Sequence, residues 1–115
     1  EEANVYFAYD RSAIGTSERP KIETLADYLE QHPEYNVIVE GHADRRGSDE
    51  YNRALSQRRA LAVKTYLVDL GIAERRIDTV AYGEERPAVS GADTEREHAK
   101  NRRVEFVIVA ADQPA

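Results

Sequence analysis

The sequence predicts an α+β sandwich in which two helices pack on one face of a mixed sheet. Stretches rich in β-formers alternate with stretches of helical periodicity in the order β-α-β-α-β-β. The 115 residues, 41% hydrophobic and 33% charged, suffice for one hydrophobic core and leave no room for a second domain. We therefore expect a single domain over residues 1–115, with its core at 4–110 and a flexible tail at 111–115.

A turn separates the first predicted strand from the first predicted helix. Residues 4–9 (NVYFAY) are rich in β-formers, and the cluster at residues 15–17 (GTS) supplies a turn and a helix cap. Apolar residues then recur at helical spacing until Pro33 stops the pattern. This spacing predicts a helix over residues 18–31, with a buried stripe of Ile22, Leu25, Ala26 and Leu29.

The next strand and helix have clear boundaries. Residues 35–43 (YNVIVEGHA) contain an apolar run that is typical of a central strand. Ser48 is a good N-cap with acidic residues in the first turn behind it, and Gly71 indicates the C-terminal stop. Together these signals predict a helix of about 22 residues.

Two further strands complete the predicted sheet. Residues 77–82 form the third strand and Arg103–Ala110 (RVEFVIVA) the fourth. The polar stretch between them, residues 83–101, contains Pro87 and predicts a loop with a short helix near residues 95–100.

Composition excludes several classes of function. The formal net charge of −6 would repel a phosphate backbone, and acids lie close to each of the four arginine pairs, so we expect no nucleic-acid binding. The absence of cysteine excludes disulfides and thiolate metal sites. No apolar run approaches the roughly 20 residues of a membrane span. We therefore expect any membrane attachment to come through an anchor outside this chain.

Residues 40–60 (EGHADRRGSDEYNRALSQRRA) concentrate charge at a strand end, a turn and a helix start. On a helical wheel, Arg59 falls inside the apolar arc, whereas Arg58 lies at its margin. A buried guanidinium needs an anion, and Asp44 is the natural neighbour. Two interpretations stay open. Asp44 and Arg59 form a structural ion pair, or both face a cleft in which a ligand pairs with their charges. The predicted arc consists of Leu55, Ala62, Val63, Tyr66 and Leu70.

The same segment offers weaker signals for metal binding and catalysis. Glu40, His42 and Asp44 alternate along one strand, and imidazole and carboxylate suit zinc, iron or manganese. The spacing recruits neither of the other two histidines as a further ligand, so we expect no metal and no cofactor. The serines of this segment lack a nucleophile-elbow pattern, so we expect no enzyme.

A longer pattern runs through the chain. It consists of VEGHAD at residues 39–44, RG at 46–47, YNxxLSxRRAxAVxxYL at 51–67, YGE at 82–84 and KNRRV at 100–104. This pattern resembles the OmpA-like peptidoglycan-binding domain and, within that family, the peptidoglycan-associated lipoproteins (Pal) of Gram-negative bacteria. The resemblance covers nearly the whole chain and implies the OmpA-like fold.

The resemblance implies non-covalent binding of peptidoglycan through the meso-diaminopimelate of its stem peptide. The side-chain end of this residue carries an ammonium and a carboxylate, which Asp44 and Arg59 would bind respectively. Further contacts implied by the resemblance are a hydrogen bond from Asn52, a floor from Leu55, and walls from Tyr9, Asp10, Ala43 and Arg103.

The resemblance also implies a place in the cell envelope. The domain would lie in the periplasm, associated with the outer membrane, and tether that membrane or a periplasmic protein to the cell wall. The alternative is a protein-interaction domain of a Tol-Pal-type complex, with Tol-system partners and a purely structural pair of Asp44 and Arg59. One position departs from the family: Ala8 replaces the acid that usually follows the phenylalanine, and we expect Ala8→Asp to tighten ligand binding.

Overall fold

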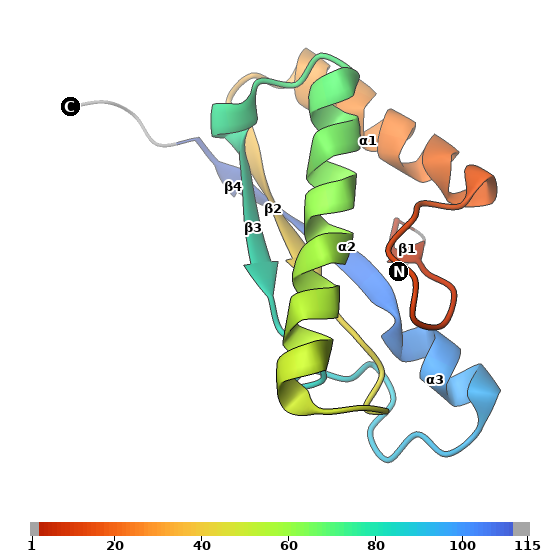
Figure 1. Cartoon of the computed structure of the whole chain (residues 1–115). Coiled ribbons are helices and arrows are strands. Elements are labelled where there is room, and N and C mark those ends of the chain that lie inside the picture. Colours follow the sequence, from red (N-terminus) through yellow and green to blue (C-terminus); the bar gives the residue numbers. More distant parts are fainter. Residues whose placement is uncertain (1–2, 112–115) are drawn as a thin grey trace.

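The computed structural model describes residues 3–111 and confirms the α+β sandwich (Figure 1). Helices α1 and α2 lie on one face of a four-stranded sheet, and the short helix α3 precedes the last strand. Most of the predicted tail lies outside the described residues. In chain order the elements are β1 (Val5–Tyr6), a 3-10 turn (Thr16–Glu18), α1 (Arg19–Gln31), β2 (Tyr35–Gly41), α2 (Asp49–Asp69), a second 3-10 turn (Glu74–Arg76), β3 (Ile77–Ala81), α3 (Glu95–Asn101) and β4 (Arg103–Ala110).

The strands follow the order β1-β4-β2-β3. Strand β2 lies centrally, as predicted, parallel to β3 and antiparallel to β4, which in turn pairs with β1. Side chains alternate along β2: Val37 and Val39 are buried on the face that packs against α2, whereas Ile38 and Glu40 are partly exposed on the other face. The sheet therefore has one apolar, helix-covered face and one open face.

The first strand is shorter than predicted. The chain leaves the sheet after Tyr6, although the Phe7 N–H still bonds to the Arg102 carbonyl. Residues 8–11 instead form a turn whose carbonyl oxygens accept hydrogen bonds from the side chain of Arg59. An arginine that arrives from α2 thus replaces a neighbouring strand as the partner of this backbone.

The buried face of α2 is rotated from the predicted arc. Arg59 is fully buried and Arg58 is exposed, as predicted, but Tyr66 is only half-buried and Leu70 is 38% exposed. Small and polar residues occupy the true face because α2 lies very close to β2. The buried side chains of α2 are Asn52, Leu55, Ser56, Arg59, Ala60, Val63 and Leu67.

This close approach depends on Gly41. A Cβ atom at Gly41 would lie 2.0 Å from the backbone carbonyl oxygen of Ser56. Because backbone faces backbone, neither side can yield cheaply. We expect Gly41→Ala to lower the free energy of unfolding by about 3 kcal/mol, measured by denaturant titration. The matched control is Gly15→Ala, where a Cβ meets nothing within 4 Å, and equal losses in both variants would contradict this account.

Candidate functional site

A narrow cleft lies between the turn after β1, the end of β2 and the first half of α2. The structure brings seven of the eight predicted site residues together in it. Its volume is only about 20 Å³, which is room for roughly one water molecule. The residues that line it are Tyr9, Asp10, Ala43, Asp44, Arg46, Tyr51, Asn52, Leu55 and Arg59.

The guanidinium of Arg59 is fully buried, lies over the ring of Phe7 at 5.3 Å and, within residues 3–111, donates hydrogen bonds to backbone carbonyls alone. Its Nε donates to the Arg11 oxygen at 2.8 Å, Nη1 to the His42 oxygen at 2.9 Å, and Nη2 to the Ala8 oxygen at 3.3 Å. Within residues 3–111, no carboxylate lies at ion-pair distance from it. Two of the five N–H groups of the guanidinium therefore have no acceptor in the described part of the chain.

The charge of Arg59 is maintained despite its burial. Burial, together with the positive charge of Arg102, lowers the pKa of Arg59 to about 10, while the charges of Asp44 and Asp10 oppose this shift. The side chain is still cationic at neutral pH. Among the described residues this buried cation has no carboxylate partner to compensate its charge.

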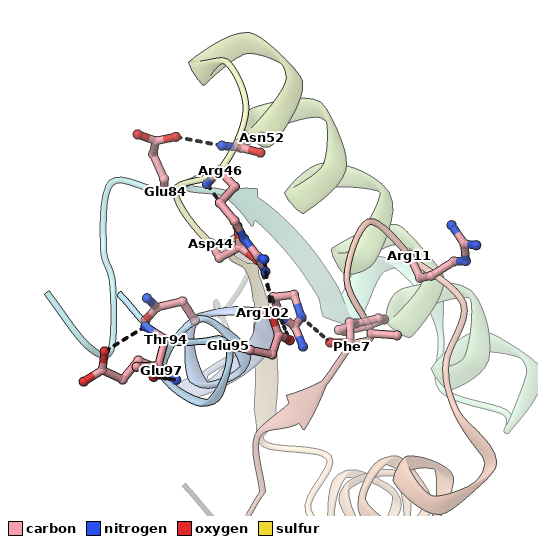
Figure 2. A network of polar contacts seen from close by, with 12 residues as sticks. Phe7, Arg11, Asp44, Arg46, Asn52, Glu84, Thr94, Glu95, Glu97 and Arg102 are labelled. Carbon is pink, nitrogen blue, oxygen red and sulfur yellow. Dashed lines mark hydrogen bonds and ion pairs between the residues drawn. The ribbon is translucent and has the colours of Figure 1, made fainter. Parts of the chain in front are cut away.

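Asp44 is 5% exposed and pairs with two other arginines (Figure 2). Arg46 contacts it three times: the backbone N–H and Nε bind Oδ1 at 3.0 and 3.2 Å, and Nη2 binds Oδ2 at 2.8 Å. Nη1 of Arg102 lies 3.5 Å from Oδ2. Among the described residues there is no ion pair between Asp44 and Arg59, so the structural pair, one of the two interpretations that the sequence left open, does not form. The turn after β2 directs Arg46 back onto Asp44, while carbonyl oxygens hold Arg59.

Asp44 stays ionised because of these partners. Burial raises its pKa, but the hydrogen bonds from Arg46 and the charge of Arg102 outweigh burial and hold the pKa below its usual value. The cleft therefore presents a carboxylate and, on its other side, a guanidinium.

Arg46 also lines the cleft, and sequence reasoning did not include it in the site. Its guanidinium stacks over the ring of Tyr9 at 4.2 Å and also contacts Glu95 at 3.2 Å. Its side chain is 34% exposed, so it can move without leaving a buried void. An arginine two residues after an acid in a turn is the signal that could have identified it.

The remaining lining residues are held by contacts of their own. The amide of Asn52 is buried and donates to Glu84 at 2.7 Å (Figure 2). Asp10 has a φ of 56°, and this turn places its carboxylate where the Tyr51 hydroxyl donates to it. The contact raises the pKa of Tyr51. Tyr51 is a second lining residue that sequence reasoning did not assign to the site.

The structure does not bring Arg103 to this cleft. Its guanidinium bonds to Glu105 and to the carbonyls of Asn101 and Arg86. Successive residues of an extended chain point to opposite sides, so Arg102 reaches Asp44 and Arg103 does not. Ala8 is also absent from the cleft lining; it borders a neighbouring groove beside Arg102, and the effect of Ala8→Asp stays a prediction.

Comparison with known proteins identifies similar chains. The model of the OmpA family matches residues 6–102. The peptidoglycan-associated lipoprotein of Legionella pneumophila is 47% identical over 104 residues, which cover 90% of this chain and 58% of the relative. Outer membrane porin F of Pseudomonas fluorescens is 46% identical over 112 residues, which cover 97% of this chain and 34% of the relative. The chain thus spans less than two thirds of the length of these two relatives.

Solved structures have the same fold. The peptidoglycan-associated lipoprotein from Burkholderia pseudomallei superposes with a TM-score of 0.88 at 36% identity, and the match covers 92% of this chain and 89% of that one. The C-terminal domain of Helicobacter pylori MotB has a TM-score of 0.84 at 22% identity, covering 93% and 83%, which is a likeness of fold alone. Within residues 3–111, no helix has the length and apolar character needed to cross a bilayer.

Proposed function

Because the chain belongs to the OmpA family, we propose that it binds peptidoglycan non-covalently and tethers an outer-membrane or periplasmic protein to the cell wall. The relatives named above are a peptidoglycan-associated lipoprotein and an outer membrane porin, which supports this role in the envelope of a Gram-negative bacterium. The family is one of binding domains, and the chain is not an enzyme. Partnership with Tol-system proteins stays a prediction.

The ligand group whose charges match those of the cleft is the side-chain end of meso-diaminopimelate. Two neighbouring charges support this proposal. Arg59 is buried, cationic and, among the described residues, has two N–H groups without an acceptor, and the ionised Asp44 lines the same cleft. A carboxylate would occupy the free donors of Arg59, and an ammonium on the same carbon atom would bind Asp44. One zwitterion would thus bind both protein groups, whereas a ligand without the carboxylate leaves the buried charge of Arg59 without an anion.

Entry of the ligand requires Arg46 to move. In the structure, the guanidinium of Arg46 donates hydrogen bonds to both oxygens of the Asp44 carboxylate. The ammonium of the ligand would have to bind this same carboxylate. Glu95 already contacts Arg46 at 3.2 Å and can keep it paired after the exchange. Arg46 therefore acts as an internal competitor for the ammonium group.

Co-sedimentation with purified sacculi tests the proposed function. We expect the domain to pellet with sacculi whose stem peptides contain diaminopimelate and to stay in the supernatant with sacculi that contain lysine instead. The lysine side chain retains the ammonium and lacks the carboxylate that Arg59 would bind. A domain that stays in the supernatant with both kinds of sacculi would reject the proposal.

Removing the internal competitor should strengthen binding. We expect Arg46→Ala to bind a diaminopimelate-containing peptide several-fold more tightly in titration calorimetry, because the ammonium no longer displaces a guanidinium. The control is Arg45→Ala, which removes an exposed arginine. Its only ion pair among residues 3–111 joins Nη2 to Oδ1 of Asp93 at 3.9 Å. Weaker binding by Arg46→Ala would mean that Arg46 contacts the ligand itself.

A further inference from the structure

Three potential metal ligands meet on the open face of the sheet. Glu40 on β2 lies directly opposite Glu105 on β4, and His42 follows two residues after Glu40. One ligand atom from each of the three side chains lies within 4.8 Å of the other two. Sequence reasoning lacked a further ligand for Glu40 and His42, and the register of β2 against β4 supplies Glu105.

Glu40 and Glu105 place two like charges opposite each other in the sheet. Like charges directly opposite each other in a sheet destabilise it. Arg103 binds Oε2 of Glu105 at 2.5 Å, but the carboxylate of Glu40 has no hydrogen bond or ion pair within residues 3–111. As far as the described residues go, one oxygen of Glu105 and both oxygens of Glu40 are therefore available to a ligand.

His42 points to the same conclusion independently. Its side chain is 2% exposed, and neither ring nitrogen has a hydrogen-bond partner in the described part of the chain. Tyr82 stacks on the ring, with 5.3 Å between centroids. Buried polar atoms are almost always paired, so two unpaired nitrogens on one buried ring indicate a missing partner.

We propose that Glu40, His42 and Glu105 bind a divalent transition metal ion, with zinc as the best match. A neutral imidazole and two carboxylate oxygens suit this class of metal, and water would occupy the fourth position. In a tetrahedral zinc site the ligand atoms lie about 3.4 Å apart. The three ligand atoms, which lie within 4.8 Å of one another on adjacent strands, would move closer together when the metal binds.

Two arginines, Arg103 and Arg86, lie near the proposed metal site. Burial is the largest effect that lowers the pKa of His42, and with the positive charges of Arg103 and Arg86 it brings this pKa to about 4. The negative charge of Glu105 opposes the shift. Arg103 also bonds to two backbone carbonyls, and Arg86 lies over the ring of Tyr82 at 4.1 Å. Arg103 can therefore remain bound to Glu105 as an outer-shell partner of a metal ligand.

Titration calorimetry of the whole chain with zinc chloride at pH 7 tests the proposal. We expect one zinc ion to bind and the melting temperature to rise with zinc but not with magnesium. Glu40→Gln, which keeps the shape of the side chain, should weaken zinc binding about tenfold or more. The matched control is Glu34→Gln, which alters the exposed pair of His32 and Glu34 on the other end of β2.

Two results would overturn the metal site. One is the absence of zinc binding by the wild-type chain. The other is zinc binding that Glu34→Gln removes and Glu40→Gln leaves unchanged, which would assign the ion to the exposed pair. As a second readout, cobalt should give the visible absorption of a four-coordinate site in the wild type and lose it in Glu40→Gln. The cleft beside α2 lies on the opposite side of the sheet, so peptidoglycan binding and metal binding can fail separately.

Discussion

Arg59→Ala is expected to abolish measurable binding of diaminopimelate-containing stem peptides. Removing one member of a desolvated charge pair typically costs roughly 2 to 5 kcal/mol, or about thirtyfold to several thousandfold in affinity. Arg59 is fully buried and has two N–H groups free for the ligand, which places it at the upper part of this range. Calorimetric titration of both proteins with the same peptide gives the comparison.

Ligands altered by one charge separate binding from folding. Arg59→Ala also deprives the carbonyls of Ala8, Arg11 and His42 of a donor, so it should lower stability as well. We therefore compare peptides with diaminopimelate, its amide and lysine on each protein. The wild type should prefer free diaminopimelate strongly over the other two. Arg59→Ala should bind all three equally weakly, and Arg59→Lys should retain a reduced preference because it keeps the charge without the planar fork.

Equal affinity of the wild type for lysine and diaminopimelate peptides at one ionic strength would exclude this mechanism. Arg59 would then serve only to fasten the turn after β1 to α2. The melting temperature of each variant, measured without ligand, shows how much folded protein enters the titration.

Asp44→Asn is expected to weaken ligand binding by about a hundredfold, since the ammonium then meets a neutral amide. The variant should also be less stable, because Arg46 and Arg102 lose their shared carboxylate. The pKa of Asp44 is lower in the folded state than in the unfolded chain. Its contribution to stability is therefore fully present above the unfolded pKa of about 4 and is lost as pH falls through the folded pKa.

Denaturant titrations at several pH values check the sign of this effect. The difference in unfolding free energy between wild type and Asp44→Asn should be constant above pH ~5 and shrink in more acidic solution. Asp27→Asn, at an exposed position of α1, is the control and should show no such difference. A stability difference for Asp44→Asn that grows on acidification, or unchanged affinity for the peptide, would contradict the assigned role.

Local signals made much of the fold predictable. The Ser48 side chain caps α2, as predicted, and accepts the Tyr51 N–H. Gly71 follows the end of α2 with a φ of 104°, a conformation that favours glycine. The bounds of β4 coincide with the predicted strand. Each of these features depends on a few neighbouring residues, so the sequence alone contains the necessary information.

Features that depend on contacts between distant segments were not predictable. The buried face of α2 was misjudged because Ser56 and Ala60 pack against Gly41, and no apolar pattern marks such a contact. Of the two partners of Asp44, Arg46 follows it by two residues, but Arg102 reaches it from the far end of the chain, which no local pattern indicates. Glu105 was overlooked beside Glu40 because only the strand order and register of the sheet make them neighbours.

The short strand β1 has a mechanical consequence. Only two of its residues pair with β4, so a pulling force applied to the N-terminal end of the domain would soon reach the turn behind it. That turn is fastened by Arg102, which bonds to the Phe7 carbonyl, and by Arg59, which bonds to the carbonyls of Ala8 and Arg11. The arginine proposed to hold the ligand would therefore also bear the load, and a tether under tension would transmit force directly into its own binding cleft.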